Sequence, residues 1–126
     1  MTDTLQKRHG TALLTWINRH ILNAPDIPVH FGVGTGPAAR LKLASRLCIA
    51  FTLHLTKQPI TSAAIADAGG GSDTQINYSF LYFVDQGIFD REVKNNSIGT
   101  GRIHYYTFTE QFARTINNVH NGIGVD

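Results

Sequence analysis

The chain has 126 residues, 42% of them hydrophobic, which is enough for one domain with a substantial core. Its formal net charge of +2 at neutral pH excludes a histone-like polycation but allows one local basic patch. The single cysteine, Cys48, excludes an intrachain disulfide, and no apolar run is long enough to cross a bilayer.

The first segment, 4–22, is predicted to be a helix, because Leu13, Trp16 and Ile17 fall near one face of it. Its apolar run, 12–14, is short and is soon followed by polar residues, so we predict no signal peptide, no membrane association and a cytoplasmic protein. The connector 24–37 contains a glycine-rich run from Gly32 to Gly36. This run leaves a nucleotide-binding or enzymatic protein as a distant hypothesis, but no Lys-Ser or Lys-Thr pair follows it, and a flexible connector is favoured.

A second helix is predicted over 38–57. Its apolar residues recur almost all the way round, which predicts burial on every side. Arg40, Lys42 and Arg46 cluster at its start and are interpreted as solvated ends of this buried helix, with a phosphate contact as the alternative. Pro59 ends the helix.

A short helix is predicted over 63–68, capped by Thr61 or Ser62. Three glycines, 69–71, follow it and predict a loose turn or an unusual angle between the flanking helices. Ser72 and Asp73 are good N-cap residues for a helix over 72–86, and Gly87 suits its end.

A hairpin is predicted over 88–109. It begins with Ile88 and Phe89, continues through a glycine- and asparagine-rich loop at 93–101, and returns through a β-branched and aromatic strand from Ile103. Thr109 then caps a last helix, 110–120. The sequence therefore predicts a single domain over 1–126 that is mainly α with a small β-hairpin.

The predicted helix and hairpin carry an aliphatic residue, two apolar residues, a glycine and two further apolar residues at fixed spacing, namely Ile76, Phe80, Phe83, Gly87, Ile88 and Phe89. The hairpin ends in a second pattern, made of Gly101, Arg102, Tyr106, Phe108 and Thr109. With these two patterns the stretch 60–115 resembles a winged helix-turn-helix of the MarR-like and PadR-like repressors. The sequence departs from the family at Gly69 and Gly71, where apolar residues usually pin the turn to the core.

The resemblance implies a transcriptional regulator that binds double-stranded DNA through a recognition helix, 72–86, and a wing, 88–109. The DNA contacts expected from it are Ser72, Thr74, Gln75, Asn77, Tyr78, Arg91, Lys94 and Arg102. For Arg102 the alternative is a surface salt bridge to Asp90 or Glu92. The resemblance also implies a homodimer joined through its terminal helices, with Trp16, Phe112 and Ile116 in the interface.

The alternative hypothesis is a winged-helix module for protein–protein interaction. Leu81 and Tyr82 favour it, because exposed they would be unusual on a DNA-facing helix that carries no Lys or Arg, and they are expected either to pack under the wing or to meet another protein. We predict no enzyme activity, no cofactor and no metal, since the sequence has neither Cys-x-x-Cys nor His-x-x-x-His spacing. His54, His104 and Cys48 are interpreted as core residues.

Overall fold

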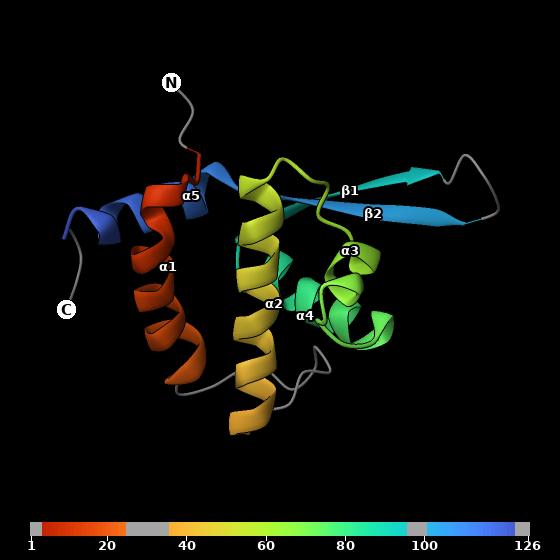
Figure 1. Ribbon diagram of the computed structural model, residues 1–126, viewed down its shortest axis with the longest axis horizontal. Helices are drawn as coiled ribbons and strands as arrows, with labels where there is room; N and C mark the ends of the chain where they lie inside the picture. The colour runs from red at the N-terminus through yellow and green to blue at the C-terminus, as the bar shows by residue number, and fades with distance from the viewer. Residues whose placement is uncertain (1–3, 25–35, 96–100, 123–126) are drawn as a thin grey trace.

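The computed structural model describes residues 4–24, 36–95 and 101–122. It confirms a mainly helical fold with one small antiparallel hairpin (Figure 1). In chain order the elements are a 3-10 turn at Lys7–His9, α1 at Gly10–Ile17, a π-helical turn at Asn18–Leu22, α2 at Pro37–Leu55, α3 at Ser62–Asp67, α4 at Asp73–Asp85, β1 at Phe89–Asn95, β2 at Arg102–Phe108 and α5 at Glu110–His120.

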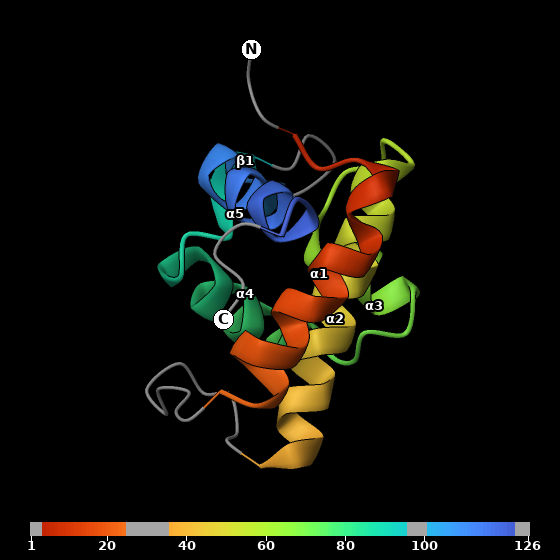
Figure 2. The same ribbon diagram turned by 90° about the vertical axis from the view of Figure 1, so that its left-hand side faces the viewer.

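The N-terminal helical segment starts at Lys7, later than the predicted residue 4. Gln6 and His9 form a reciprocal capping box, in which each side chain bonds the backbone of the other and so fixes the first turn. The next helix, α1, lies beside α2 and runs in the opposite direction (Figures 1 and 2). Gly10 lies at this contact, since a Cβ there would be 4.0 Å from the ring of Phe51.

Helix α2 crosses the middle of the molecule, but it is not buried on every side, so that prediction was wrong. Leu43, Leu47 and Phe51 are buried, whereas Leu41 is 62% exposed. Leu41 lies in the first turns of α2, a helix that begins at its lower end in Figure 1. At the other end α2 stops at Leu55, two residues before the predicted end, and Lys57 follows it with a left-handed φ of 60°.

The hairpin projects from the body of the molecule, beside α3 and α4 (Figure 1). Its two strands pair from Phe89 with Phe108 to Asn95 with Arg102. The first strand therefore continues through Asn95, and the prediction of an irregular loop from residue 93 was wrong at these first three positions. Cross-strand hydrogen bonding explains the difference, because it orders polar residues that have low intrinsic strand propensity.

An aromatic cluster joins the base of the hairpin to α4. The ring of Phe80 lies 4.5 Å from that of Tyr106 and 5.0 Å from that of Phe89, and Phe83 contacts both phenylalanines. Ile60, between α2 and α3, extends this junction, because its carbonyl accepts a hydrogen bond from the Tyr106 N–H at 3.0 Å. The bridge, which the sequence did not predict, fixes β2 next to the beginning of α3.

The last helix, α5, packs on α1 within the same chain (Figure 2). Phe112 is 4% exposed and Ile116 is fully buried, and the ring of Trp16 lies edge-on to Phe112 at 4.9 Å. Within the chain α1 therefore covers the apolar face of α5, including Phe112 and Ile116, and the dimer interface expected at these residues stays a prediction. Trp16 is half-buried in this same contact.

None of the helices in the described ranges combines the length and the apolar character needed to cross a bilayer.

Candidate nucleic-acid interface

Helix α4 carries the candidate base-reading side chains on an exposed polar face. Ser72 caps the helix by accepting from the Gln75 N–H, and Ile76 and Phe80 are fully buried on the inner face. The opposite face is exposed, as predicted, and it consists of Asp73, Thr74, Gln75, Asn77 and Tyr78. An α-helix turns 100° per residue, so burial of Ile76 and Phe80 directs these polar side chains outward.

Two of the candidate readers already make contacts within the chain. The Asn77 Oδ1 lies 2.5 Å from the Ser62 hydroxyl, which donates to it, and the Gln75 Oε1 accepts from Arg46 at 3.4 Å. An amide reads adenine through its oxygen and its NH2 group together. Asn77 must therefore exchange the Ser62 hydroxyl for a base edge, whereas Gln75 gives up only a long hydrogen bond.

Leu81 and Tyr82, which were expected either to pack under the wing or to meet another protein, lie in different environments. Leu81 is 41% exposed, whereas Tyr82 is only 6% exposed and belongs to the core. Burial raises the pKa of the Tyr82 phenol, the charge of Arg40 lowers it, and that of Asp85 raises it further.

The hairpin register separates its three cations. Arg91 pairs with Tyr106, and Arg102 pairs with Asn95. Because alternate residues of a strand share a face, both arginines lie on the same face of the hairpin as the buried Phe89 and Tyr106. Lys94 lies on the other face, where its Nζ is 3.9 Å from a Glu92 oxygen and 5.1 Å from the Tyr105 ring centre. The acidic side chain thus pairs with Lys94, and the salt bridge from Arg102 to Asp90 or Glu92 is not formed.

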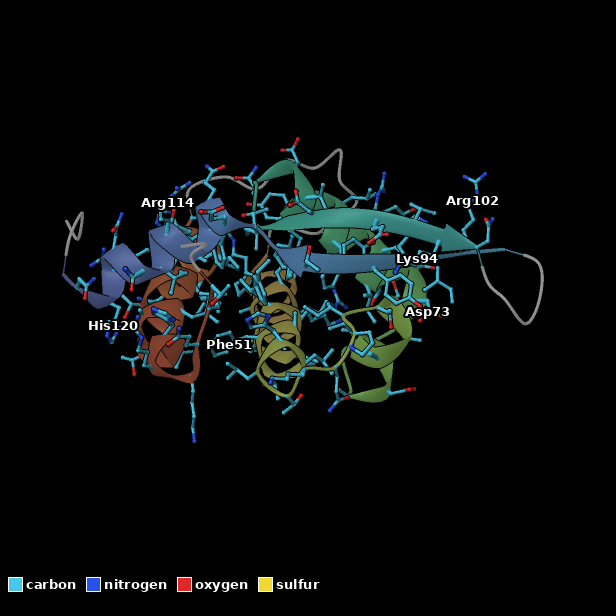
Figure 3. All side chains as sticks on the ribbon, turned by 90° about the horizontal axis from the view of Figure 1, so that it is seen from above. Phe51, Asp73, Lys94, Arg102, Arg114 and His120 are labelled. Atoms are coloured by element: carbon cyan, nitrogen blue, oxygen red, sulfur yellow. The ribbon has the colours of Figure 1, made fainter. Side chains whose placement is uncertain are left out.

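A groove of about 590 Å³ lies between β2 and the beginnings of α3 and α4. Arg102 and His104 contribute to one wall, and Ser62, Asp73 and Asn77 contribute to the other. Figure 3 shows Arg102 at the outer end of the hairpin, with Lys94 and Asp73 nearer the helices. The groove brings together a predicted wing residue and a predicted base reader that are 25 positions apart in the chain.

Arg46 connects α2 to the other side of α4. It is 5% exposed, so its interpretation as a solvated end residue was wrong. Its Nε donates to the Gly70 carbonyl and an Nη to the Ser79 hydroxyl, both at 2.7 Å, and burial lowers the pKa of the guanidinium. Its place in sequence was a usable signal, because Arg46 lies three and four residues from Leu43 and Ala50, on the buried side of α2.

The triglycine turn fits closely around this arginine and is not loose. Gly69 and Gly71 have φ of 92° and 111°, which favour glycine. A Cβ on Gly70 would lie 2.4 Å from the Ile65 Cγ2 and 2.8 Å from the Ile65 carbonyl oxygen. Arg46 therefore fixes the turn by hydrogen bonding. In the family that the sequence resembles, apolar residues usually have this role.

The segment that contains α3, α4 and the hairpin is not basic. Residues 58–109 contain three Lys or Arg side chains, Arg91, Lys94 and Arg102, against five acidic ones, Asp67, Asp73, Asp85, Asp90 and Glu92. Positive charge from outside this segment comes from Lys42 and Arg46 of α2, which lie beside the triglycine turn.

His54 and Cys48 have structural surroundings. The His54 Nε2 is 2.8 Å from the Leu5 carbonyl oxygen, and burial raises the pKa of the Cys48 thiol, which disfavours its reactive thiolate. In the part of the chain that the structure describes, no three His, Cys, Asp or Glu side chains form a group able to hold a metal ion. The Gly32–Gly36 hypothesis falls almost wholly on residues outside the described ranges.

Comparisons of the chain with protein families, with curated proteins and with solved structures found no match.

Proposed function

We propose that the protein is a winged helix-turn-helix that binds double-stranded DNA, with α4 as the recognition helix and the β1–β2 hairpin as the wing. The order of elements supports this: a helix, a bridging residue at Ile60, two helices joined by a tight turn, and a hairpin whose second strand pairs with Ile60. A helix with a buried apolar stripe and an exposed polar face is suited to enter a major groove about 12 Å wide.

The groove between the hairpin and the helices is the observation that best supports DNA binding. Arg102 on one wall and Asn77 on the other face the same space, which follows the side of α4. A duplex with α4 in its major groove places a phosphate backbone along that side of the helix. Arg102 then contacts phosphate or an adjacent minor groove, and Asn77 reaches a base edge.

Selection from a randomised duplex library with the full chain tests the proposal. We expect an enriched motif, and Asn77→Ala should relax the preference at particular base pairs, at roughly 1–3 kcal/mol for a good bidentate contact. Arg102→Ala should weaken binding to every duplex. Its matched control is Arg114→Ala, which removes the same charge from an exposed residue of α5, at the opposite end of the molecule (Figure 3).

The alternative proposal, a protein–protein interaction module, is favoured by a specific observation. Residues 58–109 carry more acidic than basic side chains, and Tyr78 and Leu81 on α4 are 43% and 41% exposed. Aromatic and aliphatic side chains on a weakly charged helix face are typical of protein interfaces. A library selection that enriches no duplex, with equal weak binding by wild type and Arg102→Ala, would favour this alternative.

The homodimer remains part of the proposal, but with a different interface. The exposed apolar side chains on the N-terminal helical segment and α2 are Leu14 at 59%, Leu22 at 37% and Leu41 at 62%. We expect light scattering to give twice the chain mass and Leu14→Glu to halve it. A wild-type chain that is monomeric at tens of micromolar rules out the dimer.

A further inference from the structure

A cavity of about 130 Å³ lies beside the triglycine turn, on the other side of α4 from the groove along the hairpin. Lys42, Ser45 and Arg46 of α2 line it, together with the glycines and Gln75. Asp73 and Asn77 line the hairpin groove. Gln75 is two positions from each of them, which is a rotation of about 200° around the helix. The cavity and the groove therefore flank the beginning of α4 on opposite sides.

The guanidinium of Arg46 lines this cavity. Among the described residues, no acidic side chain pairs with it. Its partners are the Gly70 carbonyl, the Ser79 hydroxyl and, at 3.4 Å, the Gln75 amide oxygen. All three are neutral, and the salt bridge of the described residues, Lys94 with Glu92, lies on the hairpin. A buried cation that is only hydrogen-bonded to neutral groups remains electrostatically unfavourable, and a bound anion relieves this.

Gly71 keeps the guanidinium accessible from the cavity. A Cβ at this position would lie 2.9 Å from an Arg46 Nη, so any side chain there would crowd the cation. The exposed Lys42 and Ser45 stand at the rim and add a second positive charge and a hydroxyl donor. Two cations, a hydroxyl and a small volume match the chemistry of a phosphate group.

We propose that this cavity is a phosphate-binding subsite, held by Arg46 and Lys42, which takes a backbone phosphate of the DNA strand opposite the hairpin. The inference depends on the proposed function, because a helix in the major groove has one phosphate backbone on each side. The hairpin arginines serve one backbone, and Arg46 and Lys42 serve the other. Gln75 gives up its long hydrogen bond to Arg46 when the phosphate binds.

The first test needs no DNA. Thermal unfolding of the full chain is measured in sodium phosphate and in sodium chloride at equal ionic strength. We expect a saturable rise of the melting temperature in phosphate, smaller in Lys42→Gln and absent in Gln75→Glu. The Gln75→Glu carboxylate supplies an internal counter-charge to Arg46, so this variant should also melt higher than wild type in chloride.

Lys7→Gln, on the exposed N-terminal turn, is the matched control and should respond to phosphate like wild type. Phosphate also stabilises proteins generally by exclusion from their surface. An equal, unsaturable rise in wild type, Lys42→Gln and Gln75→Glu would therefore overturn the subsite.

The second test uses a duplex enriched by selection, with single phosphates replaced in turn by uncharged methylphosphonates. We expect one short run of positions whose replacement weakens wild type more than Lys42→Gln, which keeps Arg46, and a separate run whose effect is smaller in Arg102→Ala than in wild type. Lys42→Gln should also reduce the loss of affinity between 50 and 200 mM salt by about threefold, the effect of one phosphate contact.

The outcomes separate the two proposals. If the duplex binds tightly and Lys42→Gln shows the wild-type methylphosphonate pattern and salt dependence, the subsite is wrong and DNA binding stands. If no duplex binds, but phosphate stabilises wild type and not Gln75→Glu, the subsite stands. Its ligand is then a free or small-molecule phosphate, and the proposed function fails.

Discussion

The substitution Gly70→Ala tests whether the triglycine turn is a close-packed element that positions α4. The added Cβ meets the Ile65 Cγ2 at 2.4 Å and the Ile65 carbonyl oxygen at 2.8 Å, and a backbone oxygen cannot rotate away. Forcing an extra methyl group into a packed site costs about 1–3 kcal/mol of folding free energy. For a chain of 126 residues, about 4 °C of melting temperature corresponds to 1 kcal/mol, so we expect a fall of about 4–12 °C.

Gly69→Ala is the matched control, because a Cβ there meets nothing within 4 Å but the φ of 92° disfavours it. It should lose about 1–2 kcal/mol through the backbone alone. Adding Ile65→Ala to Gly70→Ala removes the methyl clash and leaves the carbonyl clash, so the pair should remain less stable than Ile65→Ala alone. Urea unfolding gives the free energy of unfolding of wild type and of these four variants. A Gly70→Ala chain as stable as wild type, or a full rescue by Ile65→Ala, would refute the close packing of this turn.

Four further predictions follow from burial and backbone geometry. Phe112→Ala should lose about 3–5 kcal/mol in urea unfolding while light scattering gives the wild-type mass, because Phe112 packs within its own chain; a lower mass with unchanged stability contradicts this. Lys57→Gly should gain up to about 1 kcal/mol, since glycine relieves the left-handed φ, and a loss would show that the lysine side chain stabilises the end of α2. Burial raises the phenol pKa of Tyr82 and Tyr106, so stability should be full below about pH 10 and fall as the pH rises through the folded-state values; Tyr106→Phe should reduce that fall, and equal curves would contradict it. Burial also raises the pKa of the Cys48 thiol, so iodoacetamide at pH 8 should modify the native chain more slowly than the urea-unfolded chain, and equal rates would argue against this burial.

Elements with local signals could be predicted from the sequence. Ser72, Gly87 and the apolar stripe between them gave α4 to within a residue at each end, and Thr109 marked the start of α5. Each signal acts over three or four residues, through a capping hydrogen bond or one helical turn. The exposed polar face of α4 followed from the same stripe.

The features that join separate elements could not be predicted in this way. The Ile60–Tyr106 bridge and the Arg46–Gly70 hydrogen bond link residues 46 and 24 positions apart, and each depends on how the helices pack. Arg46 is also a charged residue that is buried, although charged side chains are usually exposed. Its burial explains why a run of three glycines is compatible with a fixed turn, where the sequence alone predicted either a loose turn or an unusual angle between the helices.

The packing of the terminal helices also could not be predicted from the sequence. An apolar face on α5 was taken to need a second subunit, because the sequence does not reveal which faces pair within one chain. The structure places α1 against it, with Trp16 on Phe112, and leaves Leu14 and Leu41 exposed instead. Amphipathic patterns predict that a face is covered, but they do not identify the partner that covers it.

The last prediction concerns the salt dependence of DNA binding, which measures how many cations of the folded chain contact phosphate. Along the sequence, residues 58–109 are net acidic, which argues against a nucleic-acid interface. In space, Lys42 and Arg46 of α2 lie beside the triglycine turn at the beginning of α4, and Arg91 and Arg102 lie on one face of the hairpin. If each of these four cations neutralises one phosphate, the logarithm of the binding constant should fall with the logarithm of salt concentration at a slope of about −3.6 per protomer. Fluorescence anisotropy on an enriched duplex measures the slope, and Lys42→Gln and Arg102→Ala should each make it shallower by about 0.9, whereas Arg114→Ala leaves it unchanged. A wild-type slope near zero would show that these cations do not contact phosphate, and the exposed Tyr78 and Leu81 would then mark a protein partner.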